Sequence, residues 1–324
     1  MRKLIIQIPC YNEEGTLGLT LDALPRSVAG FDVVERLIID DGSKDDTVKV
    51  ARQHGVEHIV SLSSNQGLAR AFLAGLEAAL KAGADVIVNT DADNQYDAAG
   101  IDDLVRPILA GQAQIVIGAR PISAITEFSP LKKMLQRLGS AVVKIASDTE
   151  IPDAPSGFRA IHRDAALRLN VFNNYTYTLE TIIQAGRKGI AITSVPIRVN
   201  GATRPSRLVK SMSSYVRRSI FTIVRIFVLY KPLRFFMWVG SLFLIPGVLV
   251  GARFLWKYLQ GQGDGHVQSL ILSSILIVTA MVVFGAGIVA DLVAANRVLL
   301  EEVRMRLLKA EIVSGSHDAS RPCE

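Results

Sequence analysis

The sequence is poor in the residues that form disulfide frameworks and transition-metal sites. Its 324 residues include only two cysteines, Cys10 and Cys323, and five histidines, none of them at metal-ligand spacing. This excludes a disulfide scaffold and a zinc site, and we interpret the histidines as non-catalytic.

Two glycine-rich phosphate-binding motifs are also missing. No Gly-x-Gly-x-x-Gly follows the first predicted strand, and no Gly-x-x-x-x-Gly-Lys occurs. Their absence argues against a dinucleotide-dependent oxidoreductase and a P-loop enzyme. A signal peptide is not expected either, because Met1, Arg2 and Lys3 lead into an apolar run of only about six residues.

Apolar residues make up 49% of the chain, and the net charge is +6. The apolar excess lies in the last third, and the basic residues cluster beside it. An anionic membrane surface is therefore the expected partner, and nucleic acid is not.

In the first 120 residues, short apolar runs alternate with segments of helical spacing. The runs predict strands at residues 4–9, 33–39, 56–62, 85–88 and 115–118. Helices are predicted at residues 16–24, 47–53 and 101–109, and another is opened by the turn at 65–67 and runs to about residue 81. This alternation is typical of βαβ units and a mostly parallel sheet. Further on, we predict helices at 129–147 and 178–187 and strands at 158–162 and 190–199.

The last third predicts membrane helices. Residues 235–252 form an uncharged run of 18 residues and 267–290 one of 24, long enough to cross a bilayer. The spans are expected at about 235–256 and 267–290, with a buried helical hairpin as the alternative. Residues 208–231 have an apolar face opposite a basic one, which fits a helix in the membrane interface or one packed on protein.

Basic residues predict the orientation of these spans. Ten of them flank the outer ends of the pair, and only Arg253 and Lys257 lie between the spans. Both termini are therefore expected in the cytoplasm, at a cytoplasmic membrane. The resulting organisation is an α/β domain at 1–207, a juxtamembrane helix at 208–231, a transmembrane hairpin at 232–310 and a disordered tail at 311–324. The hairpin also offers an interface for a homo-oligomer.

Acidic residues follow the strand predicted at 85–88. Asp91 and Asp93 come directly after it, and Gln95 is two residues further on. Carboxylates at the carboxyl end of such a strand can converge on one Mg²⁺ or Mn²⁺, which completes its shell with water and substrate phosphates. A solvated acidic turn is the alternative interpretation.

The first two strands also end in polar segments, at residues 9–14 and 40–43. Each segment alone could be an ordinary turn. Three of them on the same edge of a parallel sheet predict a binding site, and an acidic and aromatic lip can hold a base and ribose while a metal holds the diphosphate.

In order, the segments 8–14, 40–43, 91–96 and 153–159 resemble the signature of family 2 glycosyltransferases with the GT-A fold, a Rossmann-like α/β fold. With the membrane hairpin that follows, the chain is most similar to polyprenyl-phosphate glycosyltransferases of the dolichol-phosphate mannose synthase kind. The resemblance covers roughly residues 1–310 and implies a nucleotide-sugar donor and a polyprenyl-phosphate acceptor.

The resemblance also implies roles for individual residues. The nucleotide pocket would be lined by Pro9, Tyr11, Glu13, Asp40 and Asp41. The metal would be held by Asp91, Asp93 and Gln95. Contacts to donor or acceptor phosphates and other substrate groups would come from Arg120, Lys132, Arg137, Ser156, Arg159, Arg204 and Arg207. Gln136 stands where relatives carry a serine.

The implied reaction is a single in-line displacement with inversion, with Asp93, Arg120 and Asp153 as catalytic residues. The acceptor phosphate is already anionic, so a strong general base is unnecessary. Asp153 would either position the acceptor or act as a base. The alternative interpretation is that Asp153 has a structural role only and forms a hydrogen bond with Ser156 or a backbone amide. The alternative functions are transfer to another lipid, such as a diacylglycerol or a ceramide, and a non-catalytic nucleotide-sugar-binding membrane scaffold.

Overall fold

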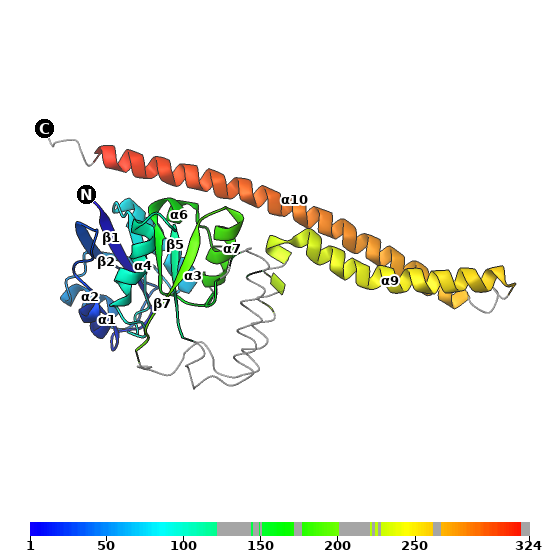
Figure 1. Ribbon diagram of the computed structural model, residues 1–324, viewed down its shortest axis with the longest axis horizontal. Coiled ribbons are helices and arrows are strands. Elements are labelled where there is room, and N and C mark those ends of the chain that lie inside the picture. The colour runs from blue at the N-terminus through cyan, green and yellow to red at the C-terminus, as the bar shows by residue number, and fades with distance from the viewer. Residues whose placement is uncertain are drawn as a thin grey trace. The chain divides into compact units, whose positions relative to one another are not determined.

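The structure is a computed structural model, and it describes residues 1–121, 144, 149, 151–171, 177–200, 221, 224–225, 228–261 and 267–318. The chain divides into two compact units. Helices and strands are labelled in Figure 1. One consists of Met1–Tyr215 together with Glu302–Glu324, and the other of Val216–Glu301.

The first unit is built on a seven-stranded sheet with the order β3-β2-β1-β4-β6-β5-β7. Strand β6 is antiparallel to both of its neighbours, and the remaining pairs are parallel. The mostly parallel sheet is therefore as predicted. The strands are β1 (Lys3–Cys10), β2 (Val33–Asp40), β3 (His58–Ser61), β4 (Val86–Asn89), β5 (Ile115–Ala119), β6 (Arg159–His162) and β7 (Ile192–Pro196).

Helices cover both faces of this sheet. On β1, Leu4, Ile6 and Ile8 share a buried cluster with residues of α1 and α4, whereas Gln7 faces α3. Burial on both faces explains why β1 is an almost continuous apolar run. The helices are α1 (Leu17–Ala23), α2 (Thr47–Gln53), α3 (Leu68–Lys81), α4 (Gly100–Leu109), α6 (Arg163–Arg168) and α7 (Thr178–Arg187).

Most predicted elements of this unit are present with shifted ends. Strands β3 and β7 are shorter than predicted, at His58–Ser61 and Ile192–Pro196. The short helix α6 is not predicted by the sequence pattern. The helix predicted at 129–147 lies outside the described residues, apart from residue 144, which is helical.

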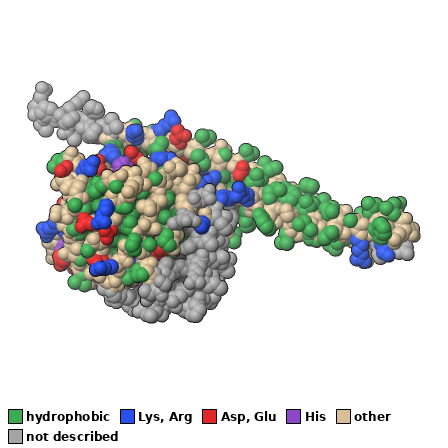
Figure 2. Space-filling model, in the orientation of Figure 1, with side chains coloured by type: hydrophobic (Ala, Val, Ile, Leu, Met, Phe, Trp, Pro, Cys, Tyr) green, Lys and Arg blue, Asp and Glu red, His purple; other side chains and the backbone are tan. Residues whose placement is uncertain are grey.

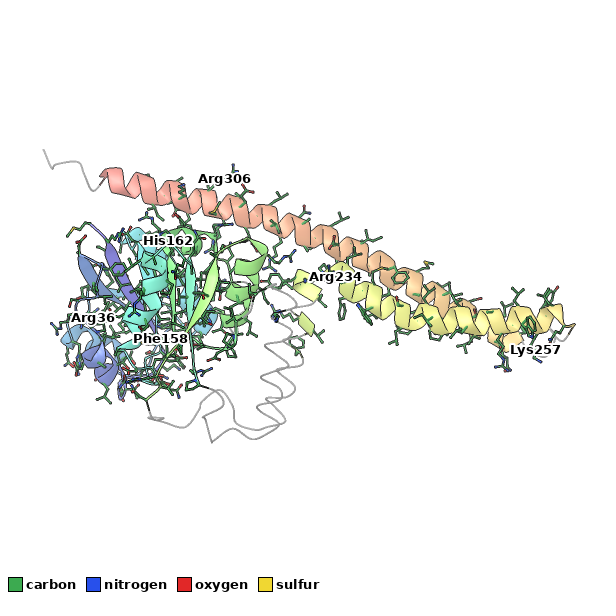
Figure 3. All side chains as sticks on the ribbon, in the orientation of Figure 1. Arg36, Phe158, His162, Arg234, Lys257 and Arg306 are labelled. Atoms are coloured by element: carbon green, nitrogen blue, oxygen red, sulfur yellow. The ribbon has the colours of Figure 1, made fainter. Side chains whose placement is uncertain are left out.

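The second unit contains the long helix α9 (Pro232–Leu259) and the first part of α10 (Val267–Asp318). Both helices are long and apolar enough to cross a membrane by length and composition. Many hydrophobic side chains lie on the visible surface of α9 and the first part of α10 (Figure 2), and Trp238 and Leu249 are mostly exposed. Arg234 and Lys257 lie near the two ends of α9 (Figure 3). Exposed apolar belts of this kind suit contact with lipid.

The last third of the chain was also predicted to contain a juxtamembrane helix and a disordered tail. The juxtamembrane helix predicted at 208–231 lies mostly outside the described residues. The disordered tail predicted from residue 311 is wrong as far as Asp318, because α10 continues to that residue. Near this end of the helix, Glu311 forms an exposed ion pair of 3.5 Å with Lys81.

Candidate active site

The acidic segments after β1, β2 and β4 lie at one edge of the sheet. Strand β1 lies between β2 and β4 and is parallel to both, and its register with β2 places Cys10 opposite Asp40. Burial raises the pKa of the Cys10 thiol, and the nearby carboxylates of Glu13, Asp40 and Asp91 raise it further. The predicted convergence of the three segments is therefore present in the fold.

Hydrogen bonds join the first two segments. Asn12, in a left-handed conformation with φ of 54°, accepts a bond from the Lys44 amide at 2.8 Å and donates its own amide to Ser43 Oγ at 2.9 Å. Asp40 Oδ1 in turn accepts from the Ser43 amide at 2.9 Å. Tyr11 remains exposed at the rim. These hydrogen bonds connect the two loops into one side of the site, in which Pro9 and Asp40 are buried.

Asp41 performs a task that the sequence did not indicate. Its two carboxylate oxygens accept bonds from the backbone amides of Gln66 and Gly67, at 2.7 and 2.8 Å. Gly67 has φ of 91° and immediately precedes α3. Asp41 therefore fixes the start of α3 against the end of β2.

The loop carrying Asp91 and Asp93 is held from two sides. Thr20 Oγ1 of α1 donates to the carbonyl of Ala92 at 2.9 Å. Asn200 donates through Nδ2 to the carbonyl of Asn94 and through its backbone amide to that of Gln95, both at 2.9 Å. Asn94 itself has φ of 53°. These contacts order the loop around the predicted metal ligands.

The electrostatics of this loop fit a divalent cation. Loss of solvation raises the pKa of Asp91 to about 6, and the adjacent Asp93 carboxylate adds to the rise. Among the described residues, no three or more His, Cys, Asp and Glu side chains are arranged so that they could hold a metal ion by themselves. A pair of carboxylates with an amide nearby matches Mg²⁺ or Mn²⁺ bound partly by water and phosphate, rather than a cation enclosed by protein.

Arg120 and Asp153 form a two-pronged ion pair. Arg120 Nε and Nη2 donate to the two oxygens of Asp153 at 2.7 and 3.0 Å, and the Arg120 amide adds a bond of 3.1 Å. Burial alone would lower the pKa of Arg120, but the bonds to Asp153 outweigh it and raise the pKa. Asp153 is fully buried. A bond from a backbone amide matches the structural alternative for this carboxylate.

Ser156 and Arg159 lie inside the protein rather than at the surface of the site. Both side chains have no exposed area. The Arg159 guanidinium donates to the carbonyls of Ser156 and Thr178 and to Thr181 Oγ1, and lies over the ring of Tyr177 at 5.3 Å. Their burial and the bonds of Arg159 indicate a supporting role, and their contact with substrate stays a prediction.

Other predicted site residues lie outside the described part of the chain, namely Lys132, Arg137, Arg204 and Arg207. A buried polar group near Asp91, made of Asn89, Tyr96 and Tyr177, was not predicted from the sequence. The one visible signal is Asn89, a polar residue that ends the apolar run of β4.

Residues 5–169 match the model of glycosyl transferase family 2. An undecaprenyl-phosphate mannosyltransferase of Micrococcus luteus is 31% identical over 207 residues, which cover 61% of this chain and 83% of the relative. A polyprenol monophosphomannose synthase of Mycolicibacterium smegmatis is 24% identical over 233 residues, covering 68% of this chain and 86% of the relative.

Solved structures show the same fold. Glucosyl-3-phosphoglycerate synthase from Mycobacterium tuberculosis, in complex with phosphoglyceric acid, superposes with a TM-score of 0.54 at 22% identity, covering 70% of this chain and 79% of the other. Its complex with Mn²⁺, uridine diphosphate and glucosyl-3-phosphoglycerate gives a TM-score of 0.50 at 22% identity, covering 68% and 80%. The predicted GT-A-like α/β fold is confirmed.

Proposed function

The chain belongs to glycosyl transferase family 2, and from this premise we propose that it transfers a sugar from a nucleotide diphosphate to a membrane polyprenyl phosphate, with inversion. The observation that carries the proposal is the acidic edge of the sheet, where Asp91 and Asp93 follow β4 beside the segments of Glu13 and Asp40. Two helices of membrane-spanning length on the same chain support a lipid acceptor.

The names of similar proteins support the same acceptor class. The relative from Micrococcus luteus is named for undecaprenyl phosphate, and one from Methanococcus voltae, 29% identical over 213 residues, for dolichyl phosphate. Both names denote phosphorylated polyprenols. A phosphate on a long apolar chain matches an enzyme whose catalytic unit is joined to membrane-length helices.

Each part of the site has a proposed task. Pro9, Tyr11, Glu13 and Asp41, with Asp40 beside them, hold the nucleotide. Asp91, Asp93 and Gln95 hold the donor diphosphate through Mg²⁺ or Mn²⁺. A divalent cation bound there supplies Lewis-acid stabilisation of the departing diphosphate. Further phosphate contacts are proposed for Lys132, Arg137, Arg204 and Arg207.

The ion pair between Arg120 and Asp153 supports one of the two roles considered for the carboxylate. Both oxygens of Asp153 already accept bonds from Arg120. We assign Asp153 the role of orienting the guanidinium toward a phosphate, since a planar arginine fork binds such oxygens well. The acceptor phosphate is ionised at neutral pH and needs no strong base, so it attacks the sugar carbon in a single displacement.

The proposed placement has both membrane helices crossing a cytoplasmic membrane, with the catalytic unit in the cytoplasm. The distribution of basic residues supports it, because ten flank the outer ends of the two spans and two lie between them.

The decisive assay uses detergent-solubilised full-length protein, a panel of radiolabelled nucleotide sugars, undecaprenyl phosphate and Mn²⁺ or Mg²⁺. We expect label to move into the organic phase from one donor, and the transfer to stop with EDTA. Asp93→Asn should lower turnover by more than the roughly 10–100-fold typical of residues that only support metal ligands. Unchanged turnover in this variant would contradict the mechanism.

The same assay tests the alternative acceptors. Diacylglycerol and ceramide replace undecaprenyl phosphate in parallel reactions. Transfer to one of these lipids alone would replace the proposed acceptor. Nucleotide binding without transfer to any lipid would favour a non-catalytic scaffold.

A further inference from the structure

A buried carboxamide lies directly beneath the acidic loop. Asn89 is the last residue of β4, two positions before Asp91, and has no exposed area. Its Oδ1 accepts a bond of 2.8 Å from Gln7 Nε2. Its Nδ2 donates to the carbonyl of Gly157 and to Tyr177 Oη, both at 2.9 Å. All three bonds fix the direction in which the carboxamide points.

These bonds are part of a clamp on the Gly157 backbone. The Gly157 carbonyl accepts from Asn89 and, at 3.4 Å, from the Tyr177 hydroxyl. The Gly157 amide donates to Tyr96 Oη at 3.1 Å. The two tyrosine rings are themselves held by stacking, Tyr177 on Phe72 at 3.8 Å and Tyr96 on Phe158 at 5.1 Å. The backbone of Gly157 is thus fixed on both sides.

Gly157 lies against the Asp91 carboxylate. A Cβ atom added at this glycine would be 3.1 Å from Asp91 Oδ1, 3.3 Å from Oδ2 and 3.1 Å from Tyr177 Oη. Such contacts are tighter than about nine in ten contacts of real Cβ atoms. A side chain at this position would therefore meet the Asp91 carboxylate on one side and Tyr177 of the clamp on the other. Gly157 and the Asp91 carboxylate are thus close neighbours, and we expect a shift of the Gly157 backbone to change the position of the carboxylate.

We propose that Asn89 is a positioning residue of the transfer reaction, which sets the location of the Asp91 carboxylate through the Gly157 backbone. The inference rests on the proposed function, because it takes Asp91 as a ligand of the cation that holds the donor diphosphate. A carboxamide suits this position because its NH₂ group donates to Gly157 and Tyr177 while its oxygen accepts from Gln7. Leucine would fill similar space and leave the Gly157 carbonyl without that donor.

The test compares Asn89→Leu with Gln184→Met in the full-length protein in detergent. Gln184 is a matched control because it is another buried carboxamide, 2% exposed, whose partner is the Asn170 backbone. Mn²⁺ affinity is measured by electron paramagnetic resonance with uridine diphosphate and, separately, guanosine diphosphate. We expect Asn89→Leu to weaken Mn²⁺ binding about tenfold. Gln184→Met should lower the unfolding temperature without changing Mn²⁺ affinity.

Three outcomes are informative. Unchanged Mn²⁺ affinity in Asn89→Leu, or an equal shift in Gln184→Met, overturns the inference. Should Asn89→Leu not fold, Tyr177→Phe removes one hydroxyl from the same clamp and is expected to weaken Mn²⁺ binding about threefold; no shift there also overturns it.

Asp91→Asn separates this inference from the proposed function. Wild-type Mn²⁺ affinity in Asp91→Asn would refute the proposed metal site itself. Weak binding in Asp91→Asn together with unchanged binding in Asn89→Leu would leave the metal site standing and reject the role of Asn89 alone.

Discussion

Asp153 and Arg120 join two segments that are distant in the sequence. Arg120 directly follows β5, and Asp153 opens the segment that leads through Gly157 into β6. The two bonds to Asp153 occupy one edge of the guanidinium group. The Arg120 side chain is 19% exposed. A pair of this geometry orients a cation better than a single contact would. We therefore expect the carboxylate to act through the arginine.

Asp153→Asn should consequently damage stability as well as turnover. The substitution places an NH₂ group against a guanidinium that can only donate, and removing one partner of a buried pair costs about 3–5 kcal/mol. We expect a fall of about 3 kcal/mol in the free energy of unfolding, measured by chemical unfolding in detergent. Asp164→Asn is the control, because the Asp164 side chain is 67% exposed. Full stability with lost turnover would instead identify Asp153 as a base.

Site residues could be predicted from the sequence where they lie at the end of a strand or just after it. Asp40, Asp91 and Asp93 lie where alternating strands and helices place them. The clamp was not predictable, because Asn89 lies 68 residues from Gly157 and 88 from Tyr177 in the sequence. No local pattern reports such a pairing, and a single polar residue at the end of a strand has many ordinary explanations.

At the scale of elements, the sequence pattern indicates a strand but not its neighbours. Residues 158–162 were predicted as a strand, and β6 is present at Arg159–His162, yet its insertion between β4 and β5 in the antiparallel direction is a property of the sheet. Helix α6 has only six residues, too few for a helical period to be recognised.

The close packing of α9 against α10 could not be predicted from composition either. Ser273 Oγ of α10 donates to the carbonyl of Gly247 in α9 at 2.8 Å. A Cβ atom added at Gly287 would be 2.7 Å from Phe236 Cβ. Small residues thus allow the two helices to approach closely, which is how helices associate in a bilayer, where lipid is as apolar as leucine.

Gly287→Leu should therefore weaken the α9–α10 pair, whereas Gly285→Leu should not. A Cβ atom at Gly285 meets nothing within 4 Å, so the same side chain is added two residues away in open space. Overpacking costs about 1–3 kcal/mol, and we expect a lower thermal unfolding temperature in detergent for Gly287→Leu alone. Equal behaviour of the two variants would show that the described contact does not hold the helices together.

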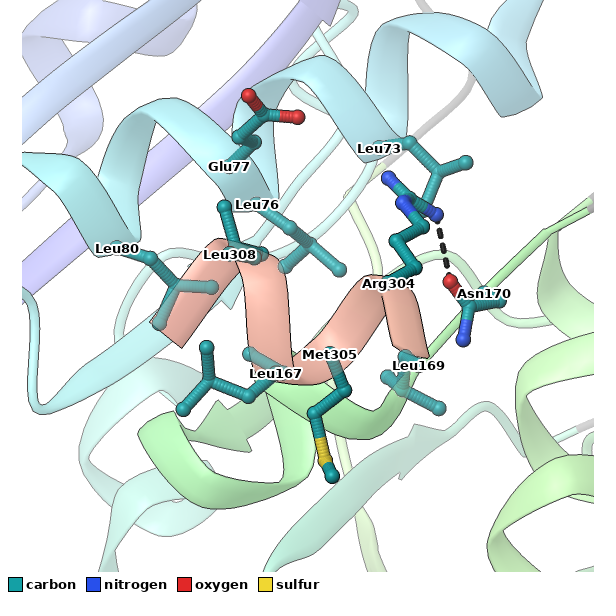
Figure 4. Close-up of a pocket in the computed structure, with 11 residues that line it drawn as sticks. Leu73, Leu76, Glu77, Leu80, Leu167, Leu169, Asn170, Arg304, Met305 and Leu308 are labelled. Atoms are coloured by element: carbon teal, nitrogen blue, oxygen red, sulfur yellow. Dashed lines mark hydrogen bonds between the residues drawn. The ribbon is translucent and has the colours of Figure 1, made fainter. Parts of the chain in front are cut away.

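At the scale of the whole chain, the last part of α10 belongs to the catalytic unit. Met305 and Leu308 lie among leucines of α3 and α6, including Leu76 and Leu167 (Figure 4). Arg304 Nη1 donates to Asn170 Oδ1 at 2.6 Å. A disordered tail was predicted from residue 311 because the end of the chain is polar. Composition could not show that one side of the helix has a partner surface.

Leu308→Glu should release this segment from α3 and α6. The change places a charge among leucines, whereas Leu307→Glu places the same charge on a neighbouring side chain that is 61% exposed. We expect faster hydrogen exchange in residues 302–312 and in α3 for Leu308→Glu only, because Leu308 is partly buried and an unpaired charge is unfavourable in an apolar contact. Helix α3 begins at the turn that Asp41 holds through Gln66 and Gly67. Faster exchange at residues 66–68 would therefore show that the end of α10 stabilises the nucleotide side of the site, and exchange confined to 302–312 would limit its effect to its own docking.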